Sequence, residues 1–259
     1  MITPECLKYA RFKEDPFALV PMRPAEVWVK RDSVLATGQL IDLRDYLLRL
    51  CRGPIYMVGS GVTEFATVVG ELGAGKSHAL LHVASALRKE CPDAVVIYLK
   101  TVRVADKTRF VDLYSEIVQT IGKEKFKQIS EKLRQIFDKK VSDKIARMTG
   151  AEVAALGERQ PRVVKGRELI RELAEDEGTK RLLIALLLLN EKPDEIFEWL
   201  KGGKGFPVEY CGEAADLPDL ESDYEAGKVL TDLIRLLTSV TDEQGKPVIS
   251  GLVLMLSLI

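Results

Sequence analysis

The residues best suited to chemistry lie in the stretch TVVGELGAGKSHALLHV, residues 67–83. Gly70, Gly75, Lys76 and Ser77 stand there at the spacing G-x-x-x-x-G-K-[ST]. A phosphate group needs many hydrogen-bond donors and no side chains in the way, and backbone N–H groups in a glycine-rich turn at a helix start provide both. The stretch therefore predicts a phosphate-binding loop.

The side chains of this loop indicate which ligand it would hold. Lys76 would reach the β- and γ-phosphates as a point charge, and the Ser77 hydroxyl would bind the Mg²⁺ that bridges them. We expect ATP and Mg²⁺ as cofactors, although such a loop reads phosphates and does not separate ATP from other nucleoside triphosphates. The predicted cofactor-binding residues are Gly70, Gly73, Ala74, Gly75, Lys76, Ser77 and His78, and Ser77 is the predicted metal contact, through the nucleotide.

The loop has the flanking elements that its function requires, namely a strand before it and a helix after it. Residues 65–69 predict the strand, and apolar residues at helical spacing predict a helix over about 76–90. The apolar runs at 94–99 and 251–257 predict two further buried strands. We therefore expect an α/β fold with a small parallel sheet of about three strands. A large helical insertion separates the second strand from the third.

The chain divides into four predicted segments. Its first 30 residues are rich in proline and predict an arm without a long helix. The stretch 208–225 contains acidic residues and no basic ones, and we expect a loop there. The segments are an N-terminal arm and helix (1–52), a nucleotide-binding core (53–105), a helical insertion (106–212), and a return to the core that ends in a buried strand (213–259).

Hydrolysis of the nucleotide would need a carboxylate at the end of a neighbouring strand, to hold the metal shell and position water. The strand at 94–99 runs into Lys100 and Thr101 instead. Asp242 and Glu243 follow apolar residues that are spaced as a helix, which argues against them. Asn190 to Asp194 resembles the guanine-reading N-K-x-D only with an extra residue, so a GTPase is not expected. The catalytic residues stay unknown.

Composition and the apolar pattern predict a cytoplasmic protein. The 259 residues carry a net charge of −1, and no apolar run approaches the ~18 residues of a membrane span. The four cysteines are scattered without a C-x-x-C pair, which is typical of reduced thiols. His78 and His82 share a helix face, but no third ligand accompanies them, and we expect them to serve packing.

The basic stretch 122–150 supports an alternative function. Its apolar residues predict a helix whose remaining positions are filled with Lys and Arg. This is either a solvated helix face or a nucleic-acid surface. In the second case the protein would be a DNA-associated or protein-interaction adaptor with a vestigial loop. Besides a nucleoside triphosphate, the open partners are thus DNA, another protein or a second copy of the chain.

The whole pattern resembles P-loop ATPases of the AAA+/STAND type. More narrowly, GELGAGKSHALLHV, FEWLKGG and AGKVLTDLIRLLTSV followed by GLVLMLSLI are similar to the N-terminal half of ATP-binding proteins from archaeal and bacterial phage-exclusion (BREX) loci. The resemblance implies a P-loop NTPase-like parallel sheet that is incomplete here, because such proteins continue from the last strand into an Asp-Glu pair. It also implies self-association, since one strand edge would be uncovered. The chain is either a fragment or a short nucleotide-binding protein without the hydrolytic acids.

Overall fold

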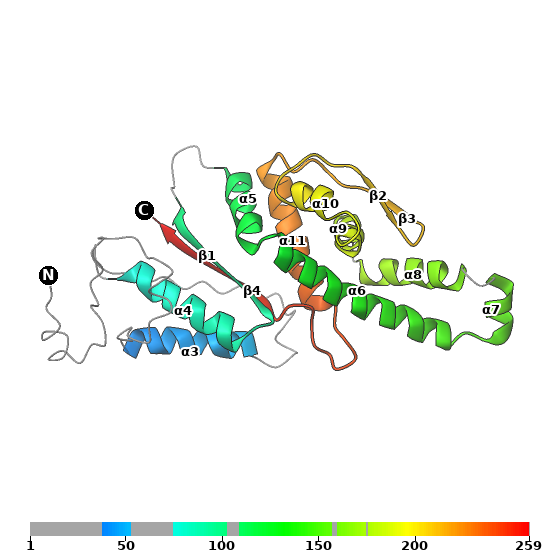
Figure 1. Cartoon of the computed structure of the whole chain (residues 1–259), viewed down its shortest axis with the longest axis horizontal. Helices are drawn as coiled ribbons and strands as arrows, with labels where there is room; N and C mark the ends of the chain where they lie inside the picture. Colours follow the sequence, from blue (N-terminus) through cyan, green and yellow to red (C-terminus); the bar gives the residue numbers. More distant parts are fainter. Residues whose placement is uncertain (1–37, 53–74, 103–108, 157–159, 175, 259) are drawn as a thin grey trace, which may run out of the picture.

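The structure, a computed structural model, describes residues 38–52, 75–102, 109–156, 160–174 and 176–258 (Figure 1). The predicted strand at 65–69, the proline-rich arm, Trp28 and the loop residues Gly70, Gly73 and Ala74 lie outside this part. The elements are α3 (Gly38–Arg52), α4 (Lys76–Glu90), β1 (Ala94–Val102), α5 (Phe110–Ile121), α6 (Lys123–Ala146), α7 (Gly150–Leu156), α8 (Gln160–Leu173), α9 (Glu177–Leu188), α10 (Pro193–Leu200), β2 (Pro207–Tyr210), β3 (Glu213–Asp216), α11 (Asp223–Ser239) and β4 (Gly251–Leu258).

Strands β1 and β4 pair in parallel, in register from Ala94 opposite Gly251 to Leu99 opposite Leu256. Successive side chains of a strand point to opposite faces of a sheet. Residues 95, 97 and 99 of β1 accordingly enter the large core formed with the insertion, whereas residues 94, 96 and 98 pack with α4. Because both faces are covered, the strands are apolar throughout rather than alternating. The α/β fold predicted from the sequence is confirmed.

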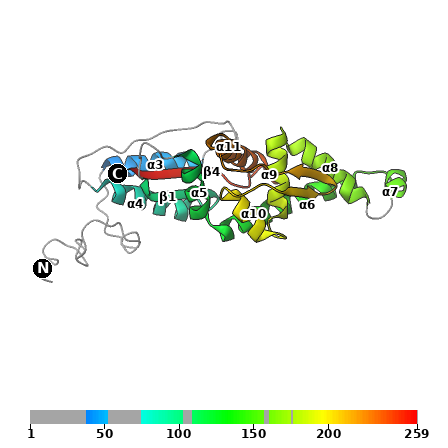
Figure 2. The same cartoon turned by 90° about the horizontal axis from the view of Figure 1, so that it is seen from above.

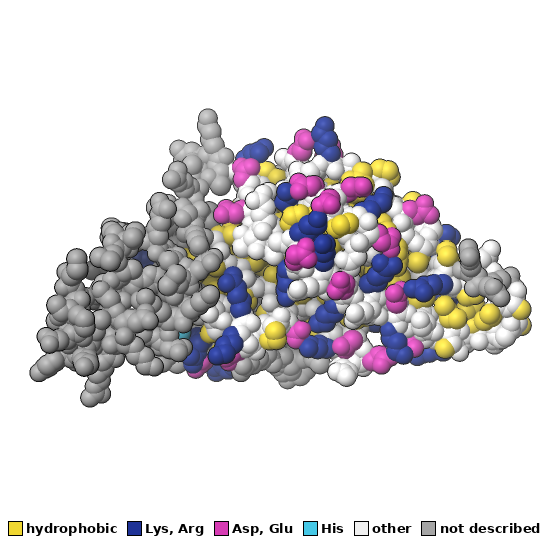
Figure 3. Space-filling view, viewed as in Figure 1, with side chains coloured by type: hydrophobic (Ala, Val, Ile, Leu, Met, Phe, Trp, Pro, Cys, Tyr) yellow, Lys and Arg dark blue, Asp and Glu magenta, His cyan; other side chains and the backbone are white. Residues whose placement is uncertain are grey.

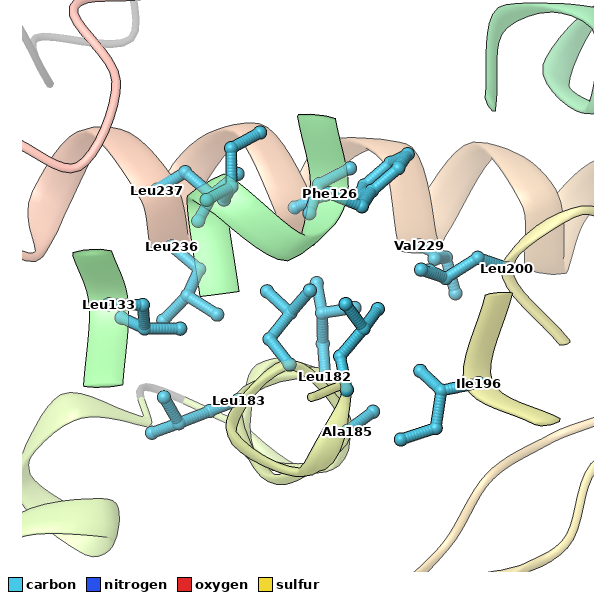
Figure 4. Close-up of a cluster of buried hydrophobic side chains, with 14 of the residues drawn as sticks. Phe126, Leu133, Leu182, Leu183, Ala185, Ile196, Leu200, Val229, Leu236 and Leu237 are labelled. Carbon is cyan, nitrogen blue, oxygen red and sulfur yellow. The ribbon is translucent and has the colours of Figure 1, made fainter. Parts of the chain in front are cut away.

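The long helical insertion is built around α9. All eight residues from Leu182 to Leu189 are buried, so this helix is apolar on every side. Figure 4 shows α9 nearly end-on, with Leu182 and Leu183 surrounded by side chains of α6, α10 and α11. Trp199 of α10 is 2% exposed and donates a hydrogen bond from its indole nitrogen to the carbonyl oxygen of Pro218. A buried tryptophan usually finds such a partner for its indole N–H group.

The molecule is elongated, with the sheet at one end and a helical arm at the other (Figures 1 and 2). Helices α3 and α4 lie beside the sheet, and α6 leads from its neighbourhood toward α7 at the far tip, from which α8 returns. Within the described residues no helix has the length and hydrophobicity needed to cross a membrane.

The prediction of a loop over 208–225 is wrong, because part of this stretch forms a β-hairpin. Strands β2 and β3 pair antiparallel, with Cys211 (φ 52°) and Gly212 (φ 72°) as a two-residue turn. Glu213 in β3 is only 7% exposed and forms ion pairs with basic side chains of α8 and α9. Burial raises its pKa, but hydrogen bonds from Lys180 and Arg171 outweigh burial and leave the pKa lowered. These tertiary ion pairs explain how an acid-rich segment becomes ordered.

A cationic side chain of α6 ties the amino ends of the two parallel strands together. The Lys132 ammonium donates to the carbonyl oxygens of Pro247 (3.1 Å) and Val248 (2.9 Å) and to Asp93 (3.3 Å). Asp93 also pairs with Lys246, and its own carbonyl oxygen accepts the amide of Ser250. The insertion is thereby fixed to the sheet where β1 and β4 begin.

We predict that Lys132→Met lowers the free energy of unfolding by about 1–3 kcal/mol, because the carbonyl oxygens of Pro247 and Val248 lose this donor and Asp93 keeps only Lys246. Lys125→Met, on the same helix, is the matched control for the added apolar surface. Urea denaturation followed by circular dichroism measures both. Equal urea midpoints of unfolding for the two variants would show that the Lys132 contacts do not stabilise the fold.

Candidate nucleotide-binding site

The first turn of α4 has the backbone of an anion-binding site. Gly75 precedes it in the left-handed conformation (φ 79°, ψ 16°), and its carbonyl oxygen accepts the first helical hydrogen bond, from Ala79 (2.9 Å). The amide groups of residues 76–78 lie in this first turn and point toward the N-terminal end of the helix, as in any α-helix. Gly75 has no side chain to cap them, and the turn contains no acidic residue. The positive end of the helix dipole is therefore available to a negative ligand.

Other helices of the protein satisfy the same groups with their own side chains. Asp176 accepts a hydrogen bond from the amide of Thr179 at the start of α9 (2.8 Å). Ser222 does the same for the amide of Glu225 at the start of α11 (3.1 Å). Both helices also have acidic residues in the first turn. The start of α4 differs in having glycine, lysine and serine where those helices have a capping side chain and acids.

The fold places this turn at the carboxyl edge of the sheet. Cys91 to Asp93 join the end of α4 directly to the beginning of β1, so the helix runs back along the strand. The Arg88 guanidinium, in the last turn of α4, donates to the carbonyl oxygen of Val96 near the beginning of β1 (3.2 Å). The first turn of α4 and the ends of β1 and β4 consequently lie at the same end of the molecule (Figure 1). Ligands of open parallel sheets bind at this edge.

The side chains predicted to bind the nucleotide are held by the packing of α4. Val83, Ala84 and Leu87 are completely buried and fix the helix against β1. Lys76 and Ser77 are half-buried in the first turn. Gly75, Lys76, Ser77 and His78 form the start of α4, and their role in nucleotide binding stays a prediction. Gly70, Gly73 and Ala74 fall outside the described residues.

His78 and His82 lie one turn apart on α4, both half-buried. Burial lowers the pKa of His78, and the neighbouring His82 lowers it further. The imidazole of His78 is therefore neutral at pH 7, next to the predicted phosphate site. In the described part of the chain, no three His, Cys, Asp or Glu side chains form a group able to hold a metal ion.

The acids considered for hydrolysis lie away from this edge. Asp242 accepts the amides of Gln244 and Lys246 in the turn that precedes β4, and Glu243 forms an ion pair with Lys139 of α6. They are thus at the amino end of the sheet, opposite the first turn of α4. Asn190 lies in the connection between α9 and α10, and Asp194 lies in the first turn of α10, inside the helical insertion. Neither group belongs to the first turn of α4, the part of the predicted site that the structure describes.

The basic stretch 122–150 is largely α6, and many of its charges are paired. Lysine and arginine side chains of α6 meet acids from the same helix, from α8, from α10 and from the loops around them. The pairs include Lys123–Asp194, Lys127–Glu124, Lys132–Asp93, Arg134–Glu191, Lys139–Glu243 and Lys144–Glu172. Figure 3 shows acidic and basic side chains interspersed over this region. The DNA-binding alternative stays a prediction that these pairs do not favour.

The comparison with family models decides the family. A model described as an AAA domain matches residues 62–191, which is half of the chain. The protein belongs to the AAA domain family. It therefore carries a nucleotide-binding P-loop module, and the matched range includes the loop, α4 and β1. The AAA match ends before β4, the strand that pairs with β1. Comparisons with curated proteins and with solved structures gave no match.

Sequence reasoning missed residues that position the site rather than form it. Arg88, Asp93 and Lys132 fasten α4, β1 and α6 to one another, yet each has the sequence context of an exposed charge. Their partners are backbone carbonyl oxygens or side chains from elsewhere in the fold. No local sequence signal identifies such contacts.

We predict opposite effects for alanine at two glycines. Gly75→Ala should destabilise the protein by about 1 kcal/mol, because an alanine at φ 79° is strained even though its Cβ meets no atom of the described residues within 4 Å. Gly150→Ala, in α7, also has open space around the Cβ but ordinary backbone angles, and it should be neutral or stabilising. Urea unfolding measures both. Equal effects would show that the left-handed turn before α4 is not required.

Proposed function

We propose that this AAA-family protein binds ATP with Mg²⁺ at the first turn of α4. The observation that carries the proposal is the turn itself: a left-handed glycine, no capping side chain, no acid, and Lys76 and Ser77 directly after the glycine. Its place at the carboxyl edge of a parallel sheet adds to this, because both strands end there. Membership of the AAA domain family agrees with a nucleotide as the anion.

The residues of the turn suit the triphosphate and its metal. The amides of residues 76–78 would donate to phosphate oxygens, and the Lys76 ammonium would neutralise part of their charge. The Ser77 hydroxyl is the hard oxygen ligand that Mg²⁺ prefers. When bound, the ion would bridge phosphate oxygens and reduce their mutual repulsion. The lowered pKa of the His78 side chain disfavours a positive charge there, so we expect His78 to contribute through its backbone amide.

We propose binding, rather than hydrolysis, as the activity of this chain. Hydrolysis depends on carboxylates placed at the metal and at the attacking water. Among the described residues, the candidates Asp242 and Glu243 lie at the opposite edge of the sheet and are used in a turn and in an ion pair. The narrower resemblance to phage-exclusion proteins, the cytoplasmic location and self-association stay predictions.

Isothermal titration of the protein with ATP and Mg²⁺ tests the proposal. We expect one binding site, and Lys76→Ala should weaken binding at least about tenfold, since a charge-assisted contact to phosphate is lost. Ser77→Ala should weaken binding with Mg²⁺ present and have less effect when Mg²⁺ is replaced by EDTA. GTP should bind similarly if only the phosphates are read.

Lys89→Ala is the matched control, because Lys89 is an exposed lysine in the last turn of the same helix. It should bind ATP as the unaltered protein does. Circular dichroism confirms that each variant is folded. Folded protein that gives no heat with ATP, or equal affinities for the Lys76 and Lys89 variants, would refute the proposal.

A further inference from the structure

Asp232 of α11 is a buried acid whose position no part of the nucleotide site explains. It is 4% exposed, and its Oδ2 atom accepts no hydrogen bond from the described residues. A Cβ atom added to Gly178 would lie 2.5 Å from Oδ2. The carboxyl group therefore points directly at the first turn of α9, and only glycine leaves room for it. An ionised carboxylate without partners is costly in such a place.

The charges around Asp232 come from two elements. Asp176, the residue that caps α9, opposes ionisation of Asp232, whereas Lys228 and Arg235 on α11 itself favour it. The cations of the first turns of α9, Lys180 and Arg181, form ion pairs with Glu177, and Lys180 also pairs with Glu213. They are engaged elsewhere.

Helix α5 also packs against α11. The polar contact between them, from the Val111 amide to Asp223, lies more than two turns before Asp232. Burial, followed by the charge of Asp176, raises the pKa of Asp232.

We propose that Asp232 makes the contact between α9 and α11 sensitive to pH: the helices pack closely when Asp232 carries a proton, and release of that proton to water loosens them. A bound cation is a poorer explanation of the two facing carboxyl groups. The positive end of α9 and the Lys228 side chain, whose Cε lies 3.1 Å from the same added Cβ, both repel a cation. They also reduce the cost of ionising Asp232, but burial and the charge of Asp176 outweigh the favourable charges and leave its pKa raised.

Loosening of the contact between α9 and α11 would affect the sheet, because α11 is connected to it. The end of this helix is joined to the approach to β4 by hydrogen bonds from Ile249 to Leu237 and from Val248 to Val240. β4 in turn pairs with β1 along most of its length. The state of Asp232 therefore affects an element that is continuous with the sheet carrying the nucleotide site. The inference does not depend on nucleotide binding and is tested without nucleotide.

Urea unfolding of the full chain at several pH values between 4 and 8 tests the proposal. A raised pKa in the folded state means that the protonated form stabilises the fold, and that this stabilisation is lost as pH rises through the folded pKa. Asp232→Asn keeps the shape and removes the titration. Its unfolding equilibrium constant, relative to that of the unaltered protein, should fall several-fold from pH 4 to pH 8. Asp216→Asn, at an exposed acid of β3, should show no such trend.

Two further measurements keep the proposal falsifiable if Asp232→Asn does not fold. The usual pKa of an Asp side chain is about 4. The carboxyl carbon resonance of Asp232 in the unaltered protein should titrate at a higher pH than this. Asp176→Asn retains a good helix cap but removes the opposing charge, so it should shift this titration to lower pH. Hydrogen-exchange protection of α11 and the start of α9 should fall as Asp232 ionises. Two results would overturn the proposal. One is a ratio of the unfolding equilibrium constants of Asp232→Asn and the unaltered protein that does not change with pH, and the other is titration of Asp232 at the usual pH for an Asp side chain.

Discussion

The parallel pairing of β1 with β4 is the constraint on which the rest of the structure depends. The two strands are neighbours although residues 103–250 separate them, so the whole helical insertion is one crossover connection. Parallel strands must begin at one edge and end at the other. The insertion therefore has to leave from the carboxyl edge and return to the amino edge, where Lys132 holds the incoming chain. This arrangement leaves the carboxyl edge to the first turn of α4.

Burial of both sheet faces fixes the start of α4 in space. One face of β1 packs with α4, and the other joins the core that includes α5, α9 and α11. Arg88 adds a polar contact from α4 to the strand backbone. A phosphate site built on a rigid helix start needs little rearrangement to bind its ligand, which reduces the entropic cost of binding. The helical insertion thus stabilises the helix start at which we propose that the nucleotide binds.

The parts predicted from sequence are those that local pattern determines. The helix after the loop, the strands at 94–99 and 251–257, and the helix within 122–150 all follow from periodicity and apolar runs. The β2–β3 hairpin was missed because Glu213 becomes buried only through ion pairs with residues distant in sequence. The position of Asp232 could not be predicted either, since the sequence of an amphipathic helix does not indicate that a single acid faces Gly178. Residue types predicted the phosphate site, and tertiary contacts determine what supports it.

The central claim is that the amide groups at the start of α4 bind the phosphates of a nucleotide. Amide NMR spectra of the ¹⁵N-labelled protein during titration with ATP and Mg²⁺ test it most directly. The account predicts that the largest shift changes fall on the amides of residues 75–78, with matching changes in the β- and γ-phosphorus resonances of ATP. Shift changes concentrated on α6, or none in the first turn of α4 at saturating ATP, would contradict it.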